Sequence, residues 1–179
     1  MRVPRTPIQG INALGERRDM RNSIRRDLLT FVLPATLVYS AGLGVCAWDL
    51  VRRQVSLFAL STRSIVGLAL IVLGLILTFV AASTLRRFYS PSLRVRRDHQ
   101  LITHGVYRFV RHPFYTGVGL STIGVLVVAG SLYGLLILLA LIPLLVNRIR
   151  IEEQMMTAQF GETYRAYARG TKKLIPFIY

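Results

Sequence analysis

Residues 114–146 read FYTGVGLSTIGVLVVAGSLYGLLILLALIPLLV, a run of 33 residues without a charged side chain. As a single helix this run would be about 50 Å long, which exceeds the roughly 30 Å hydrocarbon core of a bilayer. Gly130 and Ser131 lie near its middle, and this dipeptide is typical of a turn. The run therefore predicts a helical hairpin with arms over residues 113–129 and 132–147.

Two further charge-free runs precede the hairpin. Residues 28–48 and 65–85 each contain 21 residues without a charge. Each is long enough for one span, since a transmembrane helix needs about 20 mostly apolar residues. Only 17% of the chain is charged, against about 25% in soluble domains. We expect an all-α polytopic membrane protein with about four transmembrane helices, in which the single cysteine, Cys46, excludes an internal disulfide and a cysteine-based zinc site.

The net charge of +15 is distributed unevenly between the segments that flank these runs. Of the 23 basic residues, seven lie in segment 1–27, seven in segment 86–111 and six in segment 148–179. Segment 49–64 holds the other three. With four spans, the three richer segments share one side, which the positive-inside rule assigns to the cytoplasm. Both termini are therefore expected to be cytoplasmic. The bilayer accounts for the positive charge, and no nucleic-acid partner is expected because no nucleic-acid-binding motif is present.

The chain divides into three regions on this basis. Residues 1–27 form a cytoplasmic N-terminal segment, residues 28–85 form two transmembrane helices, and residues 86–179 contain the hairpin with the segments on either side of it. Within the first region, residues 16–27 (ERRDMRNSIRRD) fit either a short basic helix on the membrane surface or a solvated tail.

Titratable side chains suited to a site collect in two segments, and residues 98–115 form the first. This segment contains all three histidines of the chain, which are His99, His104 and His112. Gly105 permits a turn with positive φ, and Pro113 suits the first turn of the next helix. The segment fits a ligand-binding loop, or alternatively a structured loop at the membrane interface with belt aromatics. Three histidines separated by five and eight residues do not match a di-iron site, and no metal is expected.

Residues 148–167 form the second segment, at the end of the last apolar run. Arg148 and Glu152 are four residues apart and share one face of a helix. One interpretation is an ion pair that anchors the helix among the headgroups. In the other, Glu152 accepts hydrogen bonds from a cationic amine or ribose hydroxyls, and Arg148 binds an anionic group of the substrate.

Together these segments resemble a known family of membrane enzymes. Residues 99–117 (HQLITHGVYRFVRHPFYTG) resemble the signature of the isoprenylcysteine carboxyl methyltransferases, much of which the related phospholipid methyltransferases share. The resemblance spans about residues 86–179. It continues through Arg148-x-x-x-Glu152-Glu153, Phe160-Gly161-x-x-Tyr164-x-x-Tyr167 and Leu174-Ile175-Pro176.

The resemblance implies an integral-membrane methyltransferase that binds S-adenosylmethionine in a cytoplasmic pocket. No glycine-rich nucleotide fingerprint of the soluble enzymes occurs in the chain. Arg148 corresponds to the residue that orients a substrate carboxylate, and the stretch around residues 173–176 is expected to fold over the cofactor. The positions implied to bind the cofactor are His99, Gln100, Leu101, Ile102, Tyr107, His112, Pro113, Phe114, Tyr115 and Glu152.

The acceptor is expected to be lipophilic or membrane-associated, with a carboxylate as the first choice. Methyl transfer from a sulfonium needs no metal, and a carboxylate or thiolate acceptor needs no general base. A phospholipid amine or a thiol is an alternative acceptor; an amine must lose a proton, for which Glu153 or a histidine is the candidate. Two alternatives from other classes are an NADPH-dependent membrane reductase and a non-catalytic membrane scaffold.

Overall fold

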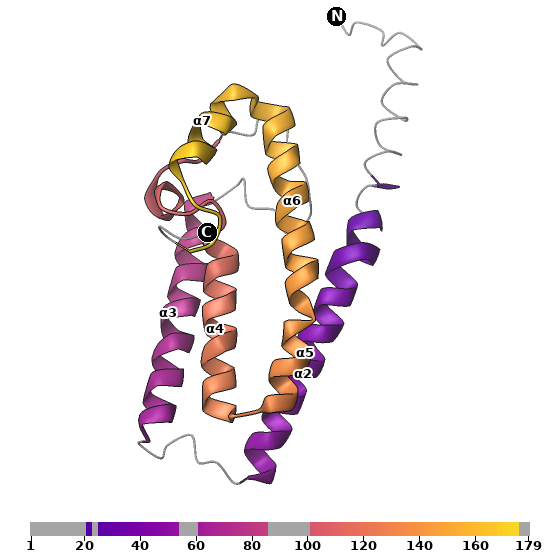
Figure 1. Ribbon diagram of the computed structural model, residues 1–179, viewed down its shortest axis with the longest axis vertical. Helices are drawn as coiled ribbons and strands as arrows, with labels where there is room; N and C mark the ends of the chain where they lie inside the picture. Colours follow the sequence, from indigo (N-terminus) through magenta and orange to yellow (C-terminus); the bar gives the residue numbers. More distant parts are fainter. Residues whose placement is uncertain (1–20, 23–24, 54–60, 86–100, 176–179) are drawn as a thin grey trace, which may run out of the picture.

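The computed structural model describes residues 21–22, 25–53, 61–85 and 101–175, and this part of the chain is helical (Figure 1). Within it no strand forms, and Val110 and Lys172 make an isolated parallel bridge. The elements, in order, are the π-helix η1 (Leu28–Val32), α2 (Leu33–Arg52), α3 (Thr62–Leu85), the 3₁₀ helix η3 (Gly105–Arg108), α4 (Pro113–Ala129), α5 (Leu132–Leu139), α6 (Leu141–Phe160) and α7 (Glu162–Gly170). The predicted all-α class is confirmed.

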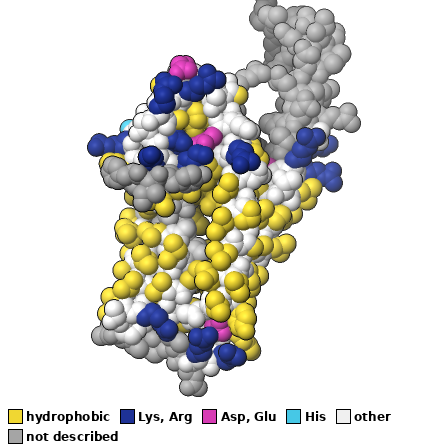
Figure 2. Space-filling view, in the orientation of Figure 1, with side chains coloured by type: hydrophobic (Ala, Val, Ile, Leu, Met, Phe, Trp, Pro, Cys, Tyr) yellow, Lys and Arg dark blue, Asp and Glu magenta, His cyan; other side chains and the backbone are white. Residues whose placement is uncertain are grey.

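Three helical segments are long and apolar enough to cross a membrane: Arg25–Arg52, Thr62–Leu85 and Leu132–Phe160. Pro113–Ala129 is a shorter apolar helix. Large hydrophobic side chains lie on the outside of these helices; Leu37 is 70% exposed and Phe79 is 73% exposed. Figure 2 shows hydrophobic side chains over the middle of the molecule and Lys and Arg at its two ends. Such a surface suits hydrocarbon rather than water.

The α3–α4 pair packs through small residues. Gly67, Gly74 and Ala81 of α3 are buried at intervals of seven residues, and Gly117 and Gly124 of α4 face them. A Cβ atom on Gly74 would lie 2.5 Å from the carbonyl oxygen of Gly117, so the two backbones are close. Small residues permit this approach, which lets van der Waals contact hold helices together in lipid. This packing fixes the start of α4, where the site lies.

The α2–α5 pair also packs through small residues, at the end of the bundle opposite the start of α4. Gly134 of α5 faces Cys46 of α2, and the Ser131 hydroxyl donates to Asp49 Oδ2 at 2.6 Å. Ser131 Oγ also accepts from the Gly134 backbone N–H at 3.0 Å and so caps α5. Asp49 is thus buried with a hydrogen-bond partner, and the hairpin turn is tied to α2.

The hairpin itself is confirmed, and one of its arms differs from the expectation. Gly130 ends α4 with φ of 58°, and α5 begins two residues later. The predicted arm 132–147 is interrupted at Ala140, where α5 ends and α6 begins. Pro143 explains the interruption, because it cannot donate to the carbonyl of Leu139 and its ring crowds that carbonyl. Pro34 likewise follows the π-helical turn η1, where the Leu33 N–H bonds to the Leu28 carbonyl.

The start of the Arg25–Arg52 helix, the loop 101–112 and α7 lie at the same end of the bundle (Figure 1). The proposed surface helix over residues 16–27 falls mostly outside the described residues. Its last three residues, 25–27, are helical and continue directly into η1.

Candidate functional site

The loop 101–112 is held against α3 and α7 through Tyr107. The buried Tyr107 hydroxyl donates to the Ala81 carbonyl at 3.4 Å, and the Tyr107 carbonyl accepts from the Tyr167 hydroxyl at 2.6 Å. Gly105 has φ of 63°, which confirms the positive-φ turn predicted there. The loop therefore has a defined path into α4, which begins at the buried Pro113.

The segment 171–175, here called the C-terminal strap, runs alongside this path. The backbone N–H groups of Arg111 and His112 donate to the carbonyls of Lys172 and Lys173 at 2.8 and 2.9 Å. The Thr116 hydroxyl donates to the Leu174 carbonyl at 2.7 Å. The strap thus covers the junction between the loop and α4. The role predicted for this stretch, folding over the cofactor, stays a prediction.

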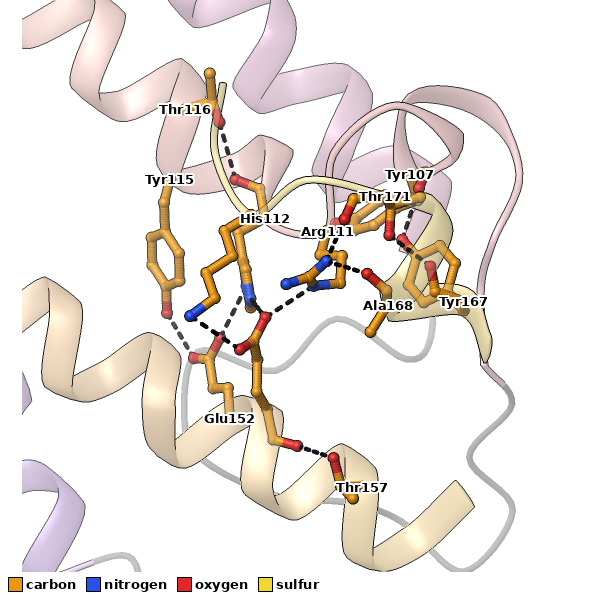
Figure 3. A network of polar contacts seen from close by, with 12 residues as sticks. Tyr107, Arg111, His112, Tyr115, Thr116, Glu152, Thr157, Tyr167, Ala168 and Thr171 are labelled. Atoms are coloured by element: carbon orange, nitrogen blue, oxygen red, sulfur yellow. Dashed lines mark hydrogen bonds and ion pairs between the residues drawn. The ribbon is translucent and has the colours of Figure 1, made fainter. Parts of the chain in front are cut away.

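Arg111 joins the strap to α6 and α7 (Figure 3). Its Nε donates to Glu153 Oε1 at 2.8 Å, and its Nη1 donates to the carbonyls of Ala168 and Thr171. The Arg111 side chain is only 9% exposed. The Arg111 guanidinium therefore joins the loop before α4 to α6 and to the C-terminal part of the chain, where α7 passes into the strap.

The two adjacent carboxylates of α6 face the start of α4. Glu152 Oε1 accepts from the Tyr115 hydroxyl at 2.6 Å, and Glu152 Oε2 lies 3.5 Å from His112 Nδ1. Glu153 Oε1 lies 3.6 Å from His112 Nε2, and Glu153 Oε2 lies 3.4 Å from Lys173 Nζ. His112 Nε2 is buried without a hydrogen-bond partner among the described residues, and the His112 ring stacks on Tyr115 with centroids 5.9 Å apart. Figure 3 shows His112, Tyr115 and Glu152 pointing toward one another.

The charge state of His112 depends on these carboxylates. Burial alone would lower the pKa of His112, but hydrogen bonding and attraction to Glu152 and Glu153 outweigh it, so the pKa is raised above 6.5. The surroundings therefore favour the imidazolium form of His112 more than water does. It links α4 to both carboxylates of α6.

The raised pKa predicts a pH-dependent contribution to stability. Because the pKa of His112 is higher in the folded state than in the unfolded state, its protonation stabilises the fold. This contribution is complete below pH 6.5 and is lost as the pH rises through the folded-state pKa. The difference in Tm between the native protein and His112→Asn should therefore be largest below pH 6.5 and shrink as the pH rises above it. Thermal unfolding in detergent measures it, with the exposed His104→Asn as control. A His112→Asn difference that grows with pH would contradict this assignment.

Arg148 lies deeper in the bundle and is 3% exposed. Its Nε donates to Glu152 Oε1 at 2.8 Å, and its Nη1 donates to Asp27 Oδ1. The guanidinium carbon also lies 4.7 Å from the ring centroid of Phe31. The predicted Arg148–Glu152 ion pair is present, and a second acid from the beginning of the chain joins it.

Several predicted positions come together here: His112, Pro113, Tyr115, Arg148, Glu152 and Glu153. Within the loop, Tyr107 contacts α3 and α7, and Leu101 and Ile102 are half-buried. The Phe114 ring packs edge-on against Tyr115. His99 and Gln100 lie outside the described residues. The roles predicted for these side chains in binding and catalysis stay predictions.

Two polar residues of the site, Asp27 and Arg111, were not assigned a role from the sequence, and Lys173 was predicted only as part of the stretch 173–176. Arg111 adjoins His112 in the quoted signature, which was the available signal for it. Among the described residues, no group of three or more His, Cys, Asp or Glu side chains is arranged to hold a metal ion.

Comparison with known proteins agrees with this geometry. Residues 62–163, from the beginning of α3 into α7, match the model of the phospholipid methyltransferase family. The chain belongs to this family. The match includes both carboxylates of α6 and the whole loop before α4, and it confirms the family resemblance stated from the sequence.

Curated relatives within the phospholipid methyltransferase family are similar over part of their length. The probable protein-S-isoprenylcysteine O-methyltransferase of Oryza sativa subsp. indica is 34% identical over 118 residues, which are 64% of this chain and 62% of the relative. Protein-S-isoprenylcysteine O-methyltransferase B of Arabidopsis thaliana is 31% identical over 115 residues, or 63% and 58% of the two chains. The aligned part thus spans about three-fifths of each of these relatives.

A solved structure of a eukaryotic intramembrane Ras methyltransferase, an isoprenylcysteine carboxyl methyltransferase, has the same helical arrangement. The two structures superpose with a TM-score of 0.67 at 29% sequence identity, over 81% of this chain and 53% of the other. Together with the apolar helices, this match shows that this member of the family is an integral membrane protein.

Proposed function

We propose that this chain is an S-adenosylmethionine-dependent methyltransferase that esterifies the carboxylate of a lipophilic acceptor of the S-prenylcysteine class. The observation that carries the proposal is the meeting of His112 and Tyr115 at the start of α4 with Glu152 and Glu153 of α6. In this proposal residues 86–179, of which the structure describes 101–175, form the methyltransferase core, and α2 and α3 support it. The core faces the cytoplasm in this proposal, on the side favoured by the distribution of positive charge.

The side chains of the site fit S-adenosylmethionine chemically. The buried Nε2 of His112 makes no hydrogen bond to the described residues, and its contact with Glu153 Oε1 is long, at 3.6 Å, so a ligand atom could take up this position. The carboxylates of Glu152 and Glu153 suit ribose hydroxyls and an ammonium group. Lys173, on the strap, suits a carboxylate. The stacked rings of His112 and Tyr115 offer an apolar, aromatic surface.

The residues of the chain position the reactants and exclude water. S-adenosylmethionine, when bound, supplies a methyl group on a positively charged sulfur. Glu152 and His112 hold the donor side, and Arg148 orients the carboxylate of the acceptor. A carboxylate is already ionised, so no residue removes a proton. Glu153 is held by Arg111 and Lys173 and therefore serves to fix the strap and His112. The catalytic contribution of the protein is then alignment and desolvation.

The acceptor approaches from the bilayer in this proposal. α4 packs along α3, whereas α6 contacts α2, α5 and α7 (Figure 1). α4 and α6 are linked near the site by the Tyr115–Glu152 hydrogen bond. An acceptor whose prenyl chain lies between α4 and α6 in the hydrocarbon region would bring the carboxylate of its cysteine to Arg148. The similarity to isoprenylcysteine O-methyltransferases of plants supports an isoprenylcysteine acceptor.

Methyl transfer from labelled S-adenosylmethionine tests the proposal. The purified protein in nanodiscs should convert an N-acetylated S-prenylcysteine to a methyl ester, from which mild base releases labelled methanol. The same acceptor with its carboxylate amidated is the matched control and should stay unlabelled.

Two other results would redirect the assignment. Base-stable label on phosphatidylethanolamine would favour amine methylation, the alternative that the family description supports. Absence of saturable S-adenosylmethionine binding, with binding of NADPH instead, would contradict a methyltransferase altogether.

A further inference from the structure

Asp27 lies at the start of the first spanning segment, 121 residues before its partner Arg148. Its side chain is 6% exposed, and that of Arg148 is 3% exposed. Asp27 Oδ1 accepts from Arg148 Nη1, while Glu152 Oε1 accepts from Arg148 Nε at 2.8 Å. The guanidinium is therefore held on two sides by carboxylates from different helices.

Phe31 adds a third contact from the same helical segment. It lies four residues after Asp27, and its ring centroid is 4.7 Å from the guanidinium carbon of Arg148. A ring packed against the guanidinium limits its tilt, and a carboxylate at Nη1 limits its rotation in plane. Asp27 and Phe31 thus restrict Arg148 more tightly than the Arg148–Glu152 pair would by itself.

The burial of this pair makes Asp27 a lasting partner of Arg148. Removing one member of a buried ion pair leaves an uncompensated charge in a poorly solvated place, which is strongly unfavourable. Asp27 also sits in a continuous helix, Arg25–Arg52, and cannot leave Arg148 as a side chain on a loop could.

We propose that Asp27 is a positioning residue for methyl transfer, which holds the Arg148 guanidinium in the orientation that the acceptor carboxylate requires. This inference rests on the proposed function, because Arg148 has an acceptor to orient only in a methyltransferase. The family match begins at residue 62, so Asp27 and Phe31 lie outside the segment that defines the family. The site is then completed by a helix outside the segment that matches the family model.

Asp27→Asn tests the proposal because it keeps the shape of the side chain and removes its charge. The rates are divided by the concentration of sites that bind S-adenosylmethionine, so that unfolded protein does not lower the measured activity. We expect kcat/KM for an N-acetylated S-prenylcysteine to fall about 10- to 100-fold, the effect of a small misplacement of an orienting group. The Kd for S-adenosylmethionine should be unchanged, because Asp27 contacts Arg148 rather than His112.

A double-variant comparison separates positioning from a general structural role. If Asp27 acts through Arg148, Asp27→Asn should have no further effect on kcat/KM in an Arg148→Met background. The matched control is Asp49→Asn, which alters the other buried acid of the same helical segment, 3% exposed and bonded to Ser131. This control should leave kcat/KM per cofactor site unchanged. Should Asp27→Asn fail to fold, Asp27→Glu keeps the charge, shifts the guanidinium and should give the same selective loss.

The outcomes are distinguishable. Two results with an active native protein would overturn the positioning role and leave the proposed function intact. One is a kcat/KM of Asp27→Asn equal to that of Asp49→Asn. The other is a double variant, Asp27→Asn with Arg148→Met, whose losses in kcat/KM are additive. A native protein that binds no S-adenosylmethionine and transfers no methyl group overturns the proposed function and this inference with it.

Discussion

Glu152→Gln is expected to lower methyl transfer about 100-fold, the equivalent of losing one or two hydrogen bonds to charged groups. The variant keeps the size of the side chain, but its amide group cannot accept from all three of Tyr115, Arg148 and His112. The loss should appear in both the Kd for S-adenosylmethionine and kcat. The reason is that Glu152 contacts the donor-side His112 and the acceptor-side Arg148 together.

The matched control for this variant is Glu162→Gln. Glu162 is also a helical acid paired with arginines, Arg165 and Arg169, but its side chain is 65% exposed. Isothermal titration with S-adenosylmethionine and the labelled-methanol assay measure both variants. Equal activity of Glu152→Gln and Glu162→Gln would show that the carboxylate pair of α6 is not the site.

Gly117→Ala is expected to destabilise the protein by about 1–3 kcal/mol, the usual cost of overpacking. The added Cβ would meet the backbone, at 2.7 Å from both the carbonyl oxygen of Gly74 and the backbone nitrogen of Thr78. Backbone cannot rotate away as a side chain can, so α3 and α4 must separate. The start of α4 would shift with them, and S-adenosylmethionine binding should weaken as well.

Gly119→Ala provides the control two residues further along α4. Nothing lies within 4 Å of a Cβ atom placed there, so the variant should only gain helix propensity, up to about 1 kcal/mol. Thermal unfolding in detergent should then show shifts of opposite sign for the two variants. A Gly117→Ala protein as stable as Gly119→Ala would contradict the close α3–α4 contact.

The sequence was most informative where local chemistry decides structure. Lengths of charge-free runs located the spanning helices, because the thickness of the bilayer limits a helix independently of its neighbours. Gly130 and Pro113 placed the hairpin turn and the start of α4, since each restricts its own backbone. The i, i+4 spacing predicted the Arg148–Glu152 pair within one helix.

Other features depend on packing between distant segments and could not be predicted in this way. The Asp27–Arg148 pair joins residues 121 positions apart, and a buried acid looks the same in sequence as an exposed one. Two features did have signals in the sequence. Pro143 indicated the break at Ala140, and the α3–α4 contact was indicated by the seven-residue spacing of Gly67, Gly74 and Ala81. Arg111 was visible in the signature, but its three partners come from helices and a strap that only folding assembles.

A structure of the protein in nanodiscs with S-adenosylhomocysteine, the demethylated product, tests the central claim most directly. We predict density for this ligand beneath the C-terminal strap, with its polar groups on Glu152 and the Nε2 atom of His112. Density at another place would contradict the account. So would a structure obtained at saturating ligand in which nothing is bound between α4 and α6 and their contacts are unaltered.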